Sequence, residues 1–309
     1  MGITVSTIAA SRRLTTRTAV RAELGAALAP ATDDALLDTL IDQASGAIRS
    51  YCHWDAFGRE ILTETLPGFG DIHLQLRRTP VVKVSTVTDI NSTIYTDYAV
   101  AEPNRGWLYR RAGWSWSAQT FPGLGASGSF LDNGYPMARQ EEPYFSVAYT
   151  AGYILPEQHL VGATTLSADA SDDSFNDSAS GFPGTLVAGD IVQSSGWANA
   201  GNNGLFVVSG TPTAAKIVVS ASLTTEAAAV DKNRTMRFLP PANVRPLDDL
   251  EKAAIETVKS WYQRRKDDAD VVEKQVGQLR IRRSEADNAR TLGLPPSAIG
   301  LLRPWVRAA

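Results

Sequence analysis

The spacing of apolar residues changes twice along the chain, from a helical period to a strand period and back. Near the N-terminus, apolar residues recur every three or four positions, which predicts helices. The first predicted helix is capped by Thr15 or Thr16, carries Val20 and Leu24 on one face, and ends at Gly25. A second predicted helix follows after Pro30.

The second predicted helix has the clearest pattern in the chain. Thr32 or Asp33 caps it, and Asp38 and Asp42 fall on its polar face. Its apolar stripe consists of Leu36, Leu37, Leu40, Ile41, Ala44 and Ile48. A helix with one apolar stripe is expected to dock on another part of the protein.

From Ile61 to Thr150 apolar and polar residues alternate, which predicts strands. The candidate strands are 72–76, 82–86, 95–100, 107–109 and 145–150. A long loop rich in Gly, Ser, Trp and Pro separates the last two, from Arg111 to Pro143. Long loops in compact proteins are often functional, so Trp114 and Trp116 are candidates for a partner or channel surface.

Residues 160–239 differ in composition from the rest of the chain. They hold few Lys or Arg and are rich in Ala, Ser, Thr, Gly and Asn. Short strands are expected at 189–192, 205–208 and 216–219, and Asn203-Gly204 is a hairpin signal. This region is interpreted as a small inserted all-β domain.

After Pro240-Pro241 the helical period returns. A helix is expected from Asp248 or Asp249 to the basic run at 264–266. Residues 276–283 are a candidate strand, on which Arg280 and Arg282 share one face. These two residues and Arg283 form a second candidate surface for an acidic partner or for DNA in a channel.

The last apolar segment of the chain allows two interpretations. It consists of Leu301, Leu302, Arg303, Pro304 and Trp305. A short helical turn with a Leu pair and a Trp is typical of a segment that docks on a partner. The same residues suit a C-terminus that folds back on its own core, and the sequence does not choose between the two.

Together these patterns predict an α+β fold. A helical body packs with a small antiparallel sheet, and a small all-β domain is inserted in the body. The body consists of residues 1–159, with two helices and a β region, and of residues 240–309, with a helix and a docking tail. The insert is 160–239.

Charge and composition exclude several functions. The chain has 309 residues, a net charge of −3 and a pI of about 5.7, unlike a strongly basic nucleic-acid binder. Residues 1–159 and 160–239 each carry −3, and residues 240–309 carry +3. A positive tail against a negative body suits charge-complementary neighbours in an assembly.

The chemistry-bearing residues do not form a recognisable catalytic set. The single cysteine, Cys52, permits no internal disulfide, and the three histidines lie far apart. The GxGxxG at 123–128 follows a proline rather than a strand, so a flexible loop is favoured over a nucleotide site. The acidic cluster at 169–177 lacks EF-hand spacing, although loose calcium binding stays open. We expect no enzyme activity, no cofactor, no metal site and no membrane span.

Both ends of the chain resemble the head–tail connector (adaptor) family of long-tailed bacteriophages. The matching segments appear in the family's order and cover roughly residues 12–159 and 240–309. They are Leu14-Thr15-Thr16 to Leu24, Thr32-Asp33-Asp34 to Ser45, Ile48 with Tyr51-Cys52, Leu74-Gln75-Leu76 with Thr79-Pro80-Val81-Val82, Tyr149 to Tyr153, Asp249 to Arg265, and Leu301 to Trp305. The family more often has Tyr where Trp305 stands, and residues 160–239 depart from its simple pattern.

The resemblance implies a structural virion protein rather than an enzyme. Its copies form a ring, typically of twelve, beneath the portal protein. The ring extends the channel through which DNA passes without sequence-specific binding, and offers a surface to a stopper or head-completion protein. The protein is then expected in the neck of the virion after assembly in the host cytoplasm, with Leu301 to Trp305 docking on the portal.

Two other functions remain open from the sequence. Aromatic platforms bind sugars, so the Trp-rich segment 107–116 and the β insert suit a carbohydrate- or surface-binding β module. A hydrolase that uses Glu141-Glu142 is disfavoured, because adjacent residues on a strand point to opposite faces.

Overall fold

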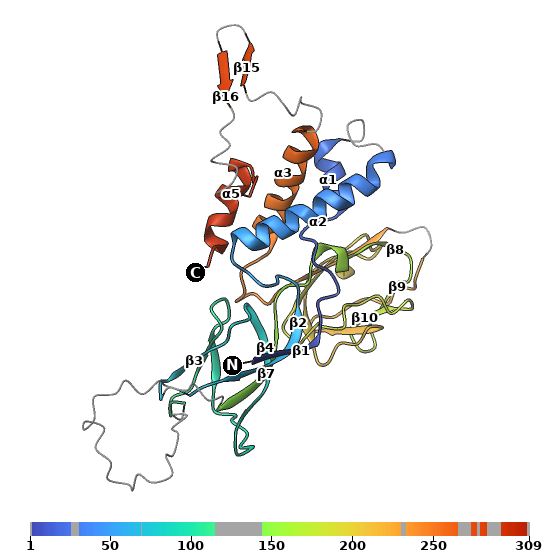
Figure 1. Cartoon of the computed structure of the whole chain (residues 1–309). Coiled ribbons are helices and arrows are strands. Elements are labelled where there is room, and N and C mark those ends of the chain that lie inside the picture. Colours follow the sequence, from blue (N-terminus) through green and yellow to red (C-terminus); the bar gives the residue numbers. More distant parts are fainter. Residues whose placement is uncertain are drawn as a thin grey trace, which may run out of the picture. The chain divides into compact units, whose positions relative to one another are not determined.

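The computed structural model describes residues 2–25, 31–68, 70–114, 144–229, 233–264, 273–276, 279–282 and 292–307. The chain forms two compact units (Figure 1). Unit 1 comprises Met1–Ile8 and Glu60–Gly152, and unit 2 comprises Ala9–Arg59 and Tyr153–Ala309.

The prediction of a helical body was wrong, because the protein is mostly β. Strands account for 32% of the described residues, and helices with their 3₁₀ turns for 25%. Among the described residues there are antiparallel sheets of four, three and seven strands, and only four helices. Helical periodicity is easy to detect over 17 or 18 residues, whereas many of the strands are four residues long and show little alternation.

Unit 1 consists of two antiparallel sheets. The larger has the order β1-β2-β7-β4, with β1 (Gly2–Thr7), β2 (Glu60–Leu66), β7 (Phe145–Ala151) and β4 (Val81–Asp89). The smaller has the order β3-β6-β5, with β3 (His73–Gln75), β6 (Trp107–Tyr109) and β5 (Ala99–Glu102). Strict alternation of buried positions along β2 marks the face that covers their shared core. That core includes Leu62, Leu74, Leu108, Trp114, Phe145 and Val147.

Unit 2 contains the helices. They are α1 (Arg17–Leu24), α2 (Asp34–Tyr51), α3 (Asp248–Arg264) and α5 (Pro296–Leu302), with the 3₁₀ turns η1 (Ala31–Asp33) before α2 and η4 (Arg303–Trp305) after α5. The Thr16 hydroxyl caps α1 by accepting a hydrogen bond from the Ala19 N–H at 3.2 Å. Gly25 ends α1 with a φ of +80°, a conformation that suits glycine. These cap positions agree with the predicted ones.

Unit 2 also contains a seven-stranded sheet with the order β8-β14-β11-β12-β13-β10-β9. Its strands are β8 (Leu160–Ala163), β9 (Leu166–Asp169), β10 (Ser174–Asp177), β11 (Ile191–Ser195), β12 (Gly204–Ser209), β13 (Lys216–Val219) and β14 (Arg234–Leu239). β8 and β9 are the two ends of this order, yet only two residues separate them along the chain. The sheet must therefore curl until its edges meet, around a core that includes Phe175, Trp197, Phe206, Ile217 and Phe238.

The buried Arg234 side chain of β14 connects the two ends of the curled sheet. Its guanidinium donates to the Leu166 carbonyl of β9 and, at 2.7 Å, to the Glu226 carboxylate. It also lies 4.2 Å from the centroid of the Trp197 ring. Because β9 and β14 belong to opposite halves of the strand order, these contacts hold the two edges together.

The hairpin expected at Asn203-Gly204 is not a tight turn. A loop containing η3 (Ala200–Asn202) joins β11 to β12, and Gly204 is the first residue of β12. The Asn203 side chain accepts a hydrogen bond from the Trp197 N–H at 3.0 Å and donates to the Asn199 carbonyl at 2.9 Å. The asparagine thus organises a longer loop through its side chain.

The η2 turn (Pro156–Gln158) and His159 lead into β8. We expect His159 to make the stability of unit 2 depend on pH. Its Nδ1 accepts a hydrogen bond from the Phe238 N–H at 3.1 Å. Burial, with a contribution from Arg237, lowers the pKa of His159 to about 4. The unfolded chain therefore binds more protons between about pH 6.5 and pH 4, and stability falls as the pH drops through this window.

We expect this loss to reach about 3 kcal/mol at pH 4. Denaturant titrations of the wild type and of His159→Asn across this pH range measure it. Asparagine retains an acceptor for the Phe238 N–H but does not titrate, so the difference between the two proteins isolates the histidine. A constant difference in free energy of unfolding from pH 7 to pH 4 contradicts the assignment.

Candidate functional site

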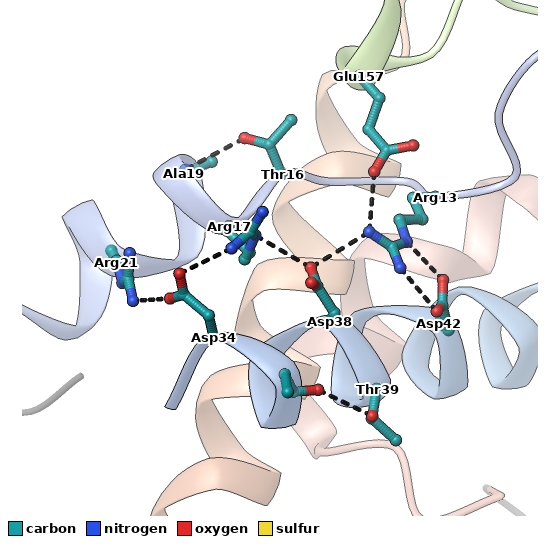
Figure 2. A network of polar contacts seen from close by, with 11 residues as sticks. Arg13, Thr16, Arg17, Ala19, Arg21, Asp34, Asp38, Thr39, Asp42 and Glu157 are labelled. Atoms are coloured by element: carbon teal, nitrogen blue, oxygen red, sulfur yellow. Dashed lines mark hydrogen bonds and ion pairs between the residues drawn. The ribbon is translucent and has the colours of Figure 1, made fainter. Parts of the chain in front are cut away.

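A ladder of ion pairs joins the segment before α1, and α1 itself, to α2 (Figure 2). Arg13, Arg17 and Arg21 are spaced four residues apart, and so are Asp34, Asp38 and Asp42. The two series run antiparallel, so that Arg13 meets Asp42, Arg17 meets Asp38, and Arg21 meets Asp34. Residues four apart lie on one helix face, which lines up the charges.

Arg13 has the most partners in the ladder. Its Nε and Nη2 bind the two oxygens of Asp42 at 2.6 and 2.8 Å, which is a bidentate pair. Its Nη1 reaches Asp38 at 3.2 Å and Glu157 of η2 at 3.1 Å. The hydrogen bond to Asp42, opposed in part by burial, raises the pKa of Arg13. Arg13 therefore links the segment before α1 to α2 and to the η2 turn.

The next arginine joins the neighbouring steps of the ladder. Arg17 binds Asp34 through Nη1 at 2.8 Å and Asp38 through Nε at 3.1 Å. Asp34 also accepts from Arg21, and Asp38 is shared with Arg13. The carboxylates are thus shared between successive arginines, and the ladder is a continuous network rather than a set of separate pairs.

Local contacts hold Arg13 in place. The Ser11 hydroxyl donates to the second oxygen of Glu157 at 2.6 Å and accepts from the Arg13 N–H at 3.1 Å. The Leu14 N–H donates to the Ser45 hydroxyl of α2 at 3.0 Å, and the Leu14 side chain is fully buried. The backbone on both sides of Arg13 is therefore fixed to other elements of unit 2.

The ladder borders a polar cleft with a volume of about 430 Å³. It is lined by Arg13, Thr16, Arg17, Thr18, Asp38 and Glu157. The guanidinium and carboxylate groups in it pair with each other. The cleft suits a docking contact that pairs hydrogen-bonding groups.

Breaking the ladder at Arg13 is expected to lower the free energy of unfolding by about 1–2 kcal/mol, above the range of a single exposed pair because three carboxylates share this guanidinium. Urea titration of Arg13→Ala measures the loss, which should shrink at high salt. Arg12→Ala is the matched control, since Arg12 is exposed and its removal should change stability by less than about 0.5 kcal/mol. Equal effects of the two substitutions contradict the network.

The C-terminal residues predicted to dock on a portal are partly buried in unit 2. Leu302 is fully buried and Trp305 is 3% exposed, both in a core shared with α2 and α3. The Trp54 indole N–H donates to the Trp305 carbonyl at 2.8 Å. These two residues therefore fold back on their own core, the second of the two interpretations. Leu301 is half-buried, and Arg303 and Pro304 are exposed.

Of the second set of predicted surface residues, the structure describes Trp114, Arg280 and Arg282. Trp114 is 1% exposed and packs edge-on against Phe145 with ring centroids 5.3 Å apart, so its interpretation as a contact surface was wrong. Its indole N–H donates to the Leu108 carbonyl. Arg280 and Arg282 lie on β16 (Leu279–Arg282), which pairs with β15 (Glu273–Val276). Trp116, Arg283, the GxGxxG and Glu141-Glu142 lie outside the described residues.

The acidic cluster of residues 169–177 is used by the protein itself. Asp173 accepts from the Leu223 N–H at 2.9 Å, Asp177 accepts from two backbone N–H groups, and Asp172 pairs with Lys216. Among the residues that the structure describes, no group of three or more His, Cys, Asp or Glu is arranged to hold a metal ion.

The ladder is not predicted by the residue pattern of either helix alone. The sequence shows that Asp38 and Asp42 are polar-face residues, but not what they face. A usable signal was present, since arginines and aspartates each repeat every four residues in segments joined by a short connection. Two complementary series of this kind predict antiparallel neighbours.

Comparison with known proteins gives no family for the chain. No family model matches it, and no curated protein matches it either. Within the described part of the chain, no helix is both long and apolar enough to span a membrane.

Proposed function

We propose that the protein is a head–tail adaptor of a long-tailed bacteriophage. In this proposal its copies form a ring beneath the portal, extend the DNA channel and offer a surface to a stopper or head-completion protein. DNA passes through without sequence-specific binding, and the protein has a structural rather than a catalytic function in the neck of the virion.

The observation that carries the proposal is the placement of the segments that resemble the adaptor family. They come from opposite ends of the chain, yet those on α1, α2, α3, α5 and η4 pack together in unit 2. One core contains Leu14, Ile48, Cys52, Leu250, Ala253, Leu302 and Trp305, among others. The adjoining core contains Val20, Leu24, Leu37, Ile41, Ala44, Val258 and Tyr262. Segments that match the family in their order along the chain thus also pack together in the cores of unit 2, and this packing supports the resemblance.

The burial of Leu302 and Trp305 reduces the set of C-terminal residues that can form the proposed portal contact. Only the exposed side chains near the C-terminus can reach a partner without unfolding α5 and η4. Among the described C-terminal residues, these are Arg303, Pro304 and Val306, the last being 41% exposed. The positive charge of Arg303 suits an acidic patch on a portal subunit.

Reversing this charge tests the proposed contact. We expect phage that carry Arg303→Glu to produce filled heads without attached tails, counted by negative-stain electron microscopy, since an interface arginine acts through specific pairing. The purified variant should unfold at the same denaturant concentration as the wild type. Arg12→Glu is the control for a charge reversal on the same unit. Normal numbers of joined particles in the Arg303 variant would exclude this contact.

A further inference from the structure

The three-stranded sheet of unit 1 has an outer face that the core does not use. Leu74, Leu108 and Val100 are paired in register across β3, β6 and β5 and point into the core. The next positions on β3 and β6 point the other way because side chains alternate along a strand. The outer face therefore carries His73 and Gln75 of β3 and Trp107 and Tyr109 of β6.

Three of these residues form a continuous aromatic row. The His73 ring lies on the neighbouring strand beside the other two, with its centroid 5.3 Å from that of Trp107 and 5.7 Å from that of Tyr109. The Tyr109 side chain is 37% exposed and Trp107 is half-buried. Aromatic side chains that serve only packing are normally covered, so a partly exposed row on a sheet is a candidate binding surface.

The flank of the row toward β5 is open beside Tyr109, whereas the exposed Arg105 guanidinium lies over the Trp107 ring, 5.5 Å from its centroid. Ala99 stands opposite Tyr109 in the register, and Ala101 is the extra residue where the register shifts. Both alanines are exposed, and their methyl groups are too short to cover the neighbouring rings. On the other flank, His73 occupies the equivalent space. The rings and the two alanines thus form a shallow shelf on which a flat, apolar face of a ligand can lie.

Hydrogen-bonding groups surround the shelf. Gln75 and Asp71 are exposed beside β3, and Glu102 stands opposite Trp107 on β5. The two arginines that flank β6 are each paired with a carboxylate, Arg105 with Glu102 at 3.2 Å and Arg110 with Asp97 at 2.8 Å. A single-stranded nucleic acid needs cations beside the stacking rings to bind its phosphates, and here these cations are already neutralised.

We infer that this face binds a neutral carbohydrate, with a sugar ring stacked on Tyr109 at the open flank, beside Trp107. The C–H groups on one face of a pyranose pack against the electron-rich faces of aromatic rings. The hydroxyl groups at the rim of the sugar are then bound by Gln75, Asp71 and Glu102, which fix its orientation. This inference goes beyond the adaptor function and does not depend on it.

The inference is tested with the full-length protein and three neutral probes, namely cellohexaose, maltohexaose and hexa-N-acetylchitohexaose. Each is titrated by isothermal titration calorimetry, which measures the affinity of every variant, and the tryptophan indole N–H signals of the wild type are followed by NMR. We expect at least one probe to shift the Trp107 signal saturably, and Trp107→Ala or Tyr109→Ala to weaken its binding at least tenfold. Ile94→Ala is the matched control, since Ile94 is 65% exposed on unit 1 but lies outside this sheet.

A second variant separates lost binding from lost folding. Ala99→Gln keeps every ring and the core but covers the open flank of Tyr109, and it should also weaken binding at least tenfold while the protein stays folded. The inference is wrong if no probe binds saturably, if binding persists unchanged in all three shelf variants, or if oligothymidylate shifts the Trp107 signal and the neutral sugars do not.

Discussion

Replacing Asp190 by alanine is expected to lower the free energy of unfolding of unit 2 by about 3–5 kcal/mol, because it leaves a buried charge without its partner. Arg59 Nη1 and Asp190 Oδ2 are 2.5 Å apart, and both side chains are fully buried. The same carboxylate oxygen accepts the Val187 N–H at 2.9 Å. Arg59 directly precedes β2, and Asp190 directly precedes β11, so the pair links segments 131 residues apart.

Urea titration followed by tryptophan fluorescence measures this loss. The matched control is the double variant Arg59→Met with Asp190→Leu, which removes both charges and retains the volume. It should recover most of the stability, since apolar replacement of a buried ion pair is often close to neutral. If Asp190→Ala lowers stability by less than about 1 kcal/mol, the pair does not hold these segments together.

Replacing Trp305 by alanine is expected to cost about 3–5 kcal/mol of stability, the usual loss for a large aromatic side chain in a core. The Trp305 ring packs edge-on against Tyr153 with centroids 5.8 Å apart, and it lies 6.2 Å from the Trp54 ring. The Arg245 guanidinium lies 5.2 Å from its centroid and donates to the Pro304 carbonyl at 2.6 Å. The C-terminal turn thus closes the core of α2, α3 and α5.

The adjacent Arg303→Ala variant is the control, because Arg303 is exposed and its loss should change stability by less than about 0.5 kcal/mol. Thermal and urea denaturation of the two variants compare them directly. A stable, folded Trp305→Ala protein that fails only in attachment to heads would restore the docking interpretation of this residue and contradict the buried one.

The helices of unit 2 were predictable because each carries its own evidence. Leu37, Ile41, Ala44 and Ile48 repeat at helical spacing and are all buried in α2. Thr16 and Gly25 mark the ends of α1 through local chemistry, a hydroxyl cap and a positive φ. Such signals depend on a few neighbouring residues and need no knowledge of the rest of the fold.

The sheets were less predictable because their strands are defined by distant partners. β10 is only four residues long, and besides its neighbour β9 it pairs with β13, about 40 residues further along. β1 pairs with β2, which lies more than 50 residues away, and no local sequence pattern indicates this pairing. Trp114 is a further example. It lies in a Gly-rich segment, and nothing in the local sequence indicates that its side chain is buried in a core.

The candidate site was partly visible in the sequence. Asp38 and Asp42 were recognised as a polar face, and the C-terminal Leu and Trp residues as a segment that either docks on a partner or folds back on its own core. Their partners, Arg13 and Glu157 for the ladder and Trp54 and Tyr153 for the turn, are brought in by tertiary packing alone.

The central claim is that the protein is a ring-forming adaptor in the neck of a virion, and cryo-electron microscopy of the purified phage tests it most directly. The account predicts a ring of density beneath the portal into which unit 2 fits, with α1, α2, α3 and α5 resolved as rods in every subunit. A neck in which no density accommodates these helices, or virions that lack the protein altogether, would contradict it.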